Sequence, residues 1–333
     1  MKNKLLLTTA IAGLTAIAGV ANAETKVSGN LEQTFKSSSY SSTPATSGRS
    51  LGAEYNIGLS SSAELNNGLS AKFGFNIESN EDGAADTGVT DSHYLSIGND
   101  QIQFVIGRDN GQNLSSTVIP HISDQAGTVV DGETLGNVGS VDAHNFDHVR
   151  LDAAVLGGTV TLRYAPDNGA GTHNASSISD TGTSQQEIIY SGSLGVEGLK
   201  VQAGISQEDK VGSNVEDQEY KKIGVSYNFG QFAVGAERAV DTAGTTSKVE
   251  LTRNTFGLTF AANDNLSFGV NYGETEKETA GVKSTTDQEV LMVGIGYNLG
   301  GIAVDINYAD VSDLGNSAGA DAEFFQIRTI QKF

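Results

Sequence analysis

Apolar and polar residues alternate along most of the chain with a period of two. In residues 294–310, Ile295 and Tyr297 alternate with small or polar neighbours, and the alternation resumes after Gly300 and Gly301. Two such runs predict antiparallel strands with one apolar face, and the two glycines can accept the positive φ of a primed hairpin turn. In a water-soluble protein the apolar face would form a core, whereas in a membrane barrel it would face lipid.

The same alternation recurs along the chain, and helical periodicity fits none of these runs. It predicts sixteen strands, at residues 25–36, 49–65, 69–79, 90–98, 101–108, 145–156, 159–165, 184–196, 199–207, 219–229, 232–240, 247–262, 265–275, 286–299, 302–311 and 322–333. The positions between the apolar ones carry mostly Gly, Ser, Asn, Thr and scattered charges, which suit the wall of a water-filled lumen.

The connections between the expected strands alternate strictly between two classes. Eight are long, polar and rich in Ser, Asp and Gly, and they contain all three prolines. Seven are tight turns, at Asn66-Asn67-Gly68, Asn99-Asp100, Gly157-Gly158, Glu197-Gly198, Gly230, Asn263-Asp264 and Gly300-Gly301. Short turns at one rim, long loops at the other and an even strand number are typical of bacterial outer-membrane barrels. We therefore predict an all-β fold, a transmembrane 16-stranded antiparallel β-barrel with short periplasmic turns and long external loops, wide enough to leave a channel.

The N-terminal residues have the layout of a secretory signal. Lys2 and Lys4 precede an apolar stretch that ends at Ala21-Asn22-Ala23, a small-residue cleavage site. This order predicts a signal peptide at residues 1–23 and a mature barrel at 24–333. A membrane-anchor helix is the alternative, and it is disfavoured because the stretch is short and no second apolar span follows.

Composition argues against several classes of function. The chain has 40 acidic and 20 basic residues, whereas a nucleic-acid partner requires a basic surface. It has no cysteine, which excludes a disulfide scaffold and thiolate metal sites. Neither a P-loop nor a dinucleotide-binding glycine motif between a strand and a helix is found, so we expect no cofactor.

Two further patterns could suggest other chemistry. The motif GRSLG around Ser50 matches the elbow that presents a nucleophilic serine, but an elbow needs strand, turn and helix, and here the motif opens an expected strand. His144 and His148, with Asp142 and Asp147 beside them, have a spacing that serves zinc on a helix, whereas this segment fits a loop that runs into a strand. We therefore expect neither a catalytic nor a metal site.

Several features together resemble the general diffusion porins of Gram-negative bacteria, the outer-membrane trimeric porin family. They are the cleavable signal, the sixteen-strand count, "HYLSIGNDQIQFVIGRDNG" at His93–Gly111 and the terminal Phe333, and they span the whole mature chain. That stretch is similar to the family's fourth and fifth strands, which end in Gly-Arg before the third external loop. The resemblance implies an outer-membrane location, a homotrimer of separate pores and an assembly signal at Phe333.

The connection at residues 109–144 is the longest in the chain, and the resemblance implies that it folds inward and narrows the barrel. Its candidate acidic residues are Asp109, Asp124, Asp131, Glu133 and Asp142. Candidate basic residues of the facing pore wall are Arg49, Lys72, Arg150, Arg163 and Arg328. Opposed rows of charge would create a transverse field that orients polar solutes and sets ion preference. The alternative is that these are ordinary solvated charges of a wet lumen and loop.

We interpret the chain as an outer-membrane porin of a Gram-negative bacterium, exported through the periplasm, that passes ions and small hydrophilic solutes by passive diffusion. Its expected partners are outer-membrane lipid, those solutes and two further copies of the chain. A substrate-selective outer-membrane channel, a barrel-embedded enzyme and a secreted adhesive β protein remain as alternatives. An adhesive solenoid would repeat one unit length, and an embedded enzyme would carry a credible Ser/His/Asp set, neither of which the chain shows.

Overall fold

Alternating apolar residues form long antiparallel strands in this protein. The computed structural model describes residues 24–41, 47–65, 68–79, 89–108, 111–122, 147–166, 184–209, 217–244 and 248–333. The expected signal peptide, residues 1–23, lies outside the described residues. Within the described ranges, no helix is long and apolar enough to cross a membrane.

The strands follow the expected order, and most of their ends lie within a few residues of the expected ones. They are β1 (Glu24–Tyr40), β2 (Gly48–Glu64), β3 (Ser70–Ser79), β4 (Val89–Gly98), β5 (Ile102–Arg108), β6 (His148–Val155), β7 (Gly158–Ala165), β8 (Ser184–Gly192), β9 (Leu199–Asp209), β10 (Gln218–Phe229), β11 (Phe232–Ala243), β12 (Val249–Ala261), β13 (Leu266–Thr279), β14 (Val282–Lys283), β15 (Gln288–Asn298), β16 (Ile302–Ser312) and β17 (Ala322–Lys332). A 3₁₀ turn, η4 (Leu314–Asn316), precedes β17.

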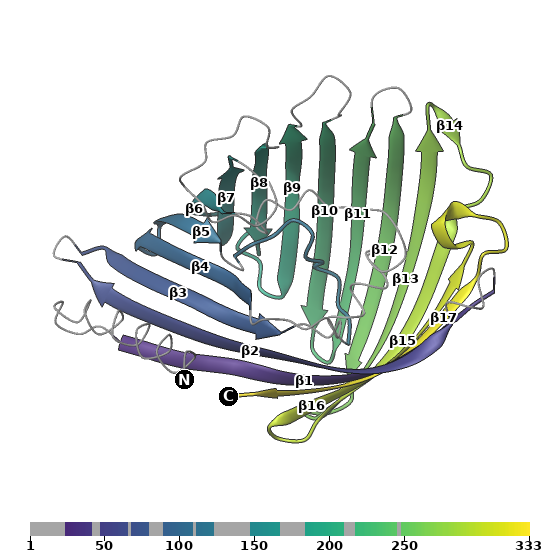
Figure 1. Cartoon of the computed structure of the whole chain (residues 1–333), viewed down its shortest axis with the longest axis horizontal. Coiled ribbons are helices and arrows are strands. Elements are labelled where there is room, and N and C mark those ends of the chain that lie inside the picture. The colour runs from purple at the N-terminus through teal and green to yellow at the C-terminus, as the bar shows by residue number, and fades with distance from the viewer. Residues whose placement is uncertain are drawn as a thin grey trace.

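The sheet closes on itself. Each long strand pairs antiparallel with its neighbours in the chain, and β1 pairs with both β2 and β17 (Figure 1). The two-residue β14 pairs with β13 at the tip of a hairpin, while β13 pairs directly with β15, so the ring itself has sixteen strands. Closure leaves no strand edge exposed to lipid, where an unpaired backbone group would be costly. The predicted all-β barrel is confirmed.

The two faces of the barrel differ as the sequence pattern requires. On β10, Ile223 and Val225 are 60% and 43% exposed, whereas Lys222 before them and Ser226 after them are 4% and 5% exposed. Apolar side chains thus point away from the barrel, and polar side chains line its interior. In a bilayer the outward rows contact lipid, while the inward rows border the water-filled lumen.

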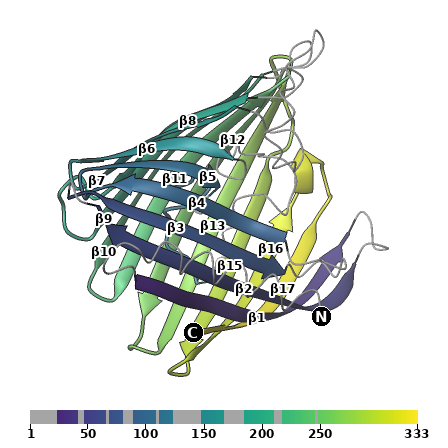
Figure 2. The same cartoon turned by 60° about the vertical axis from the view of Figure 1, so that its left-hand side comes forward.

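Short turns lie at one rim of the barrel (Figure 2), and the strand ends that the longer connections join lie at the other. Two of the tight turns differ in detail from the expected ones. Leu156 and Gly157 have φ of 50° and 71°, the two positive values of a type I′ turn, so this turn lies one residue earlier than Gly157-Gly158. In the Gly300-Gly301 pair only Gly300 has a positive φ, of 85°, and the φ of Gly301 is not positive. This combination matches a type II′ turn.

The seam between the first and last strands extends to the end of the chain. Gly29 and Phe333 exchange two backbone hydrogen bonds, of 3.1 and 3.0 Å. The Phe333 ring lies over Gly29, because a β-carbon there would come 2.6 Å from Cζ of the ring. Glycine at this position therefore lets the terminal aromatic ring lie directly on β1.

Candidate functional site

Residues 111–122 lie inside the barrel, against its inner wall, and form the blue coil in the middle of Figure 1. Leu114 is fully buried against Ile189 of β8 and Tyr220 of β10. Ile119 is 2% exposed and packs against Met292 of β15. These partners occupy inward positions on their strands, so the segment crosses the inner face of one side of the barrel. We call residues 111–122 the wall segment.

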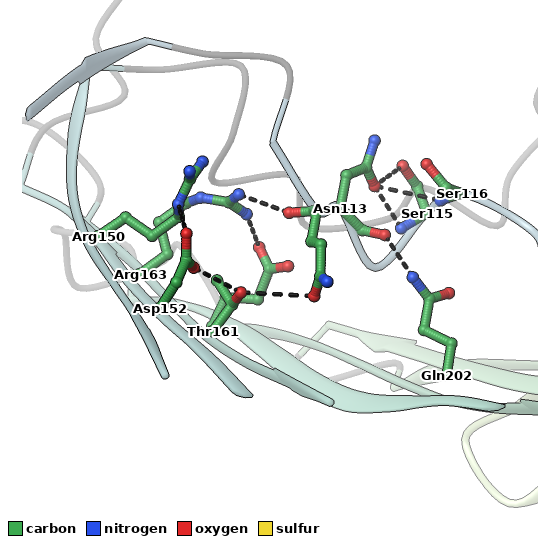
Figure 3. Close-up of polar contacts among 10 residues, drawn as sticks. Asn113, Ser115, Ser116, Arg150, Asp152, Thr161, Arg163 and Gln202 are labelled. Atoms are coloured by element: carbon green, nitrogen blue, oxygen red, sulfur yellow. Dashed lines mark hydrogen bonds and ion pairs between the residues drawn. The ribbon is translucent and has the colours of Figure 1, made fainter. Parts of the chain in front are cut away.

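Polar side chains of the wall bind the backbone of the wall segment. Four inward residues on four strands donate hydrogen bonds to its carbonyl oxygens: Arg163 to Gln112, Gln202 to Asn113, Lys222 to Ser116 and Asn271 to Pro120. Figure 3 shows the first two of these contacts. Because the wall segment is coil, its carbonyl groups have no strand partner, and these side chains satisfy them.

Glu237 on β11 anchors the centre of the wall segment. Its Oε2 accepts hydrogen bonds from the Thr117 hydroxyl at 3.2 Å and from the Val118 amide at 3.3 Å. Lys222 Nζ lies 3.5 Å from the same oxygen, and Arg253 Nη2 lies 3.7 Å from Oε1. The side chains of Glu237 and Lys222 are fully buried, so each charge depends on its partners for compensation.

The start of the wall segment lies over a cluster of charged side chains (Figure 3). Arg150 on β6 donates from Nε to Asp152 over 3.0 Å, and Thr161 donates to the same carboxylate over 2.7 Å. Arg163 on β7 forms a buried ion pair of 2.9 Å with Glu187 on β8. Arg150 and Arg163 therefore face the lumen as expected, but each is paired with a carboxylate of the wall itself.

Glycines on β10 to β13 make room for the second half of the wall segment. An added β-carbon would come 2.6 Å from Val118 at Gly224, 2.8 Å from Pro120 at Gly235, 2.5 Å from the Pro120 carbonyl at Gly257 and 2.6 Å from Ile122 at Gly269. Separations this short require the neighbouring atoms to shift. We call these four glycines the glycine trough, because the wall segment lies in the space that larger side chains would fill.

Arg328 on β17 lies at the seam, between carboxylates of the two adjacent strands. Its Nη2 is 3.0 Å from Asp305 Oδ2 on β16, and its Nη1 is 3.4 Å from Glu32 Oε2 on β1. Arg328 is 4% exposed. It is an inward cation, as expected, but two wall carboxylates lie against it, and the sequence did not identify either of them.

The two remaining basic candidates lie on β2 and β3. Lys72 is exposed at an inward position of β3, opposite Ser62 and Ser96. Arg49 occupies the row of Leu51 and Tyr55, which is the apolar outer face of β2. The alternation of β2 thus directs Arg49 away from the lumen, contrary to the expectation.

The other predicted residues fall partly outside the described ranges. Those outside are the five acidic candidates and one histidine: Asp109, Asp124, Asp131, Glu133, Asp142 and His144. His148 begins β6 and is buried, while Asp147 beside it lies 3.2 Å from His93 on β4. Ser50 lies inside β2 with strand on both sides, so the strand–turn–helix geometry of a nucleophile elbow is not formed there.

A model of the Gram-negative porin family matches residues 8–316. The chain belongs to this family. Together with the closed barrel, this makes the protein an outer-membrane diffusion channel of the Gram-negative type. A comparison with curated proteins finds no match.

Solved structures of outer-membrane proteins are similar to this porin in fold. A loop L8 deletion mutant of OmpT, an outer membrane protein of Vibrio cholerae, superposes with a TM-score of 0.71 at 14% identity, covering 93% of this chain and 99% of that one. The trimer form of in-vitro folded OmpT superposes with a TM-score of 0.67 at 14% identity, covering 93% of this chain and 99% of that one. The anion-selective porin from Comamonas acidovorans superposes with a TM-score of 0.70 at 16% identity, covering 94% of this chain and 100% of that one. At these identities the likeness concerns the fold.

Sequence reasoning on this porin missed most residues that hold the wall segment. Glu237 and Lys222 stand at inward positions of β11 and β10, so a charge at such a position was the available signal for both. Gln202 and Asn271 gave no signal, because neutral polar residues are common in a wet lumen. The glycine trough gave none either, since an inward glycine has the same pattern as any other small residue.

Proposed function

We propose that this porin passes ions and small hydrophilic solutes by passive diffusion and that residues 109–144 form the constriction. The observation that carries the proposal is the position of the wall segment, which belongs to this connection and lies on the inner face of the barrel. Its carbonyl groups are bound by four wall side chains and its centre by Glu237. A connection this long is usually functional.

The charges of the constriction form the second part of the proposal. Asp109, Asp124, Asp131, Glu133 and Asp142 would supply its acidic side. Lys72 and Arg328 lie on strands of the seam side of the barrel, away from the wall segment, and they are the candidates for the facing basic side. Arg150 and Arg163 would act differently, because they lie at the start of the wall segment. Like Arg328, each is paired with a wall carboxylate, Asp152 and Glu187 respectively.

We also propose a homotrimer with a mature N-terminus at Glu24. A trimer form is described for the similar Vibrio cholerae OmpT. The outer face of the first three strands includes small residues such as Ala53 and Ala71, which would allow close backbone approach between protomers in lipid. Phe333, paired with Gly29 at the seam, would serve as the assembly signal.

Single-channel recording in a planar bilayer tests the constriction. Deletion of residues 123–142 keeps the wall segment and should raise the conductance and admit larger sugars in liposome swelling. Deletion of residues 170–180, in a different long connection, is the matched control and should change neither. An unchanged conductance and size limit in the first deletion would place the connection outside the permeation path.

Catalysis is not part of the proposal, because both the family and the barrel fold favour a channel over an enzyme. A substrate-selective channel is the second candidate function. One feature favours it, a cavity in the inner wall near the rim of the long loops.

A further inference from the structure

A cavity of about 400 Å³ lies in the lumen wall, where β1, β2, β15, β16 and β17 approach the rim of the long loops. Most of its lining residues occupy inward positions of these strands. Cavities of about 560 and 640 Å³ elsewhere are lined mainly by outward residues such as Phe104, Leu95 and Ile106, and they face lipid. The seam cavity, as we call the first, is therefore open to solutes that enter the channel.

The row of the seam cavity nearest the rim is apolar. Phe324 on β17 is paired in register with Ala309 on β16, and Ala309 with Met292 on β15. Ala309 and Met292 are each 2% exposed, and Phe324 packs against their cluster while remaining only partly buried. Tyr40 stands against Phe324 with ring centroids 5.7 Å apart at 88°, the edge-to-face arrangement of aromatic pairs. The neighbours hold the Phe324 ring in place, and its exposed part offers a flat apolar surface to a solute.

The next row toward the barrel centre carries amides. Gln326 on β17 is paired in register with Asn307 on β16. Residues two apart on one strand face the same side about 7 Å apart, a separation that one sugar ring can span. Asn307 is 5% exposed, and its Oδ1 lies over Gly294 of β15, where an added β-carbon would meet it. The glycine thus lets the Asn307 amide lie against the wall at the edge of the cavity.

Both polar atoms of the Asn307 side chain are buried without a hydrogen bond. Neither Nδ2 nor Oδ1 has a hydrogen-bond partner among the residues that the structure describes. Unsatisfied buried polar groups are costly, and native proteins pair nearly all of them. A ligand that satisfies this amide must accept from Nδ2 and donate to Oδ1 at once. An anion cannot donate and a metal cation cannot accept, whereas two adjacent hydroxyl groups do both.

We propose that the seam cavity binds neutral sugars in their ring form on their way into the channel, an inference that rests on the proposed channel function. The apolar C–H face of the ring would pack on Phe324, and two neighbouring hydroxyl groups would bind Asn307, with the Gln326 amide beside them. A volume of about 400 Å³ is within the range of small-molecule sites. Lys36 also lines the cavity but already has a partner, so we assign it no role.

The contacts of the seam cavity with a sugar are few, which suits a site inside a channel. One ring surface and one or two amides hold a solute weakly, because association and ordering offset most of what the contacts contribute. Weak binding keeps release fast and concentrates the sugar at the mouth of the pore. Sugar flux should therefore exceed that of other neutral solutes of equal size when sugar is scarce, and it should saturate when sugar is abundant.

The test adds glucose to the long-loop side of the purified full-length porin in a planar bilayer and records the salt current. Sorbitol, the open-chain counterpart of glucose, has the hydroxyl groups without the ring, and triethylene glycol is a neutral solute of similar size without neighbouring hydroxyl groups. We expect a saturable, reversible reduction of the current by glucose, half complete at a concentration about tenfold lower than for either comparison probe. Equal reduction by triethylene glycol would mean simple obstruction of the lumen and would overturn the proposal, as would equal reduction by sorbitol.

Two variants and a matched control assign the effect to the cavity. Asn307→Leu is similar in volume and removes both amide groups, so it should weaken the glucose effect about tenfold, the equivalent of two modest hydrogen bonds. Phe324→Leu keeps an apolar side chain but removes the flat ring, and it should weaken the effect about fivefold. Asn228→Leu makes the same exchange as the first variant at an inward position near the short-turn end of β10, and it should change nothing. Equal glucose affinity of Asn307→Leu and Asn228→Leu would overturn the proposal.

The salt conductance without sugar separates this proposal from the channel function. A porin that conducts but shows no saturable effect of glucose loses only the cavity's role. A barrel that binds glucose in calorimetry in detergent but does not conduct keeps the cavity's role and loses the channel function. Asn307→Leu should fold as stably as the parent, because the amide that it removes makes no hydrogen bond within the described structure. If this variant does not fold, Phe324→Leu and the comparison of the three probes decide the outcome.

Discussion

The carbonyl oxygen of Pro120 lies only 2.5 Å from the point where a β-carbon of Gly257 would stand. Gly257→Ala should therefore push the wall segment away from β12 and into the lumen. Overpacking of this kind costs roughly 1–3 kcal/mol, which a coil segment can relieve by moving more easily than a closed barrel can. We expect a lower single-channel conductance with an intact, heat-resistant barrel on gel electrophoresis.

Gly301→Ala is the control for this substitution, because nothing lies within 4 Å of a β-carbon there and its φ is not positive. Its conductance should equal that of the parent. If Gly257→Ala also conducts like the parent, the wall segment does not border the permeation path.

Replacing Glu237 by glutamine should loosen the wall segment. The substitution removes the negative charge that lies between Lys222 and Arg253, so two buried cations lose a carboxylate partner. The free energy of unfolding should fall by about 3 kcal/mol, near the lower end of the range for breaking a buried ion pair. Thr117→Val removes a single hydrogen bond to the same carboxylate and should cost about 1 kcal/mol. Denaturation in detergent measures the free energy of unfolding of both variants. If Glu237→Gln loses no more of this free energy than Thr117→Val, Glu237 does not anchor the wall segment.

Arg328 sets the sign of the charge at the seam. Arg328→Gln removes the positive charge that lies between Glu32 and Asp305 on the lumen wall, so the local potential becomes more negative and cations are favoured. The reversal potential in a salt gradient should shift toward the cation value, most clearly at low ionic strength. Arg328→Lys keeps the charge and should shift it much less. A shift toward anion preference would show that these carboxylates do not border the ion path.

The hairpin tip formed by β13 and β14 should depend on pH. Glu276 lies beyond Tyr272, where carboxylates replace apolar residues on the outer face of β13, and its carboxylate is 2.8 Å from Lys283 Nζ. The hydrogen bond from Lys283, aided by its charge, lowers the pKa of Glu276 below 4.5, and the same contact raises the pKa of Lys283 above 10.5. The stabilisation is therefore complete between these values, and it is lost as pH falls through the lowered pKa or rises through the raised one.

Hydrogen exchange of the Ser284 amide, which donates to Lys277 O over 2.7 Å, measures the opening of this tip. Protection relative to the unstructured rate should decline below pH 4.5. In Lys283→Gln the pKa of Glu276 should move upward and the acid-dependent loss of protection should disappear. An unchanged acid limb in that variant would mean that another group is responsible.

The strands were predictable because each has one face toward lipid and the other toward the water-filled lumen. Both environments therefore require the period-two alternation of apolar and polar residues. β8 shows the limit of that signal. It was expected to reach residue 196 but ends at Gly192, because Leu194 and Gly195 take positive φ of 52° and 77° in a turn that no alternation reveals.

The site was less accessible to sequence reasoning. Alternation placed Arg150, Arg163 and Arg328 on the inner face, but it could not pair them with Asp152, Glu187 or Asp305, since pairing depends on register between strands. Arg49 was misplaced because it lies one residue off the inward row. The contacts of the wall segment with β10 to β13 join residues more than a hundred positions apart, as Thr117 and Glu237 illustrate, and no local pattern encodes them.

The pairing of Gly29 with Phe333 has a consequence for how the molecule is built. β1 is the first strand to leave the translocation machinery, yet one of its two edges stays unpaired until β17 arrives from the opposite end of the chain. Every intermediate thus carries two open, hydrogen-bonding edges that could join a neighbouring chain. Contacts of such high sequence separation also form slowly. The chain must therefore be kept apart from its copies in transit, and insertion into lipid is complete only when β1 and β17 have paired.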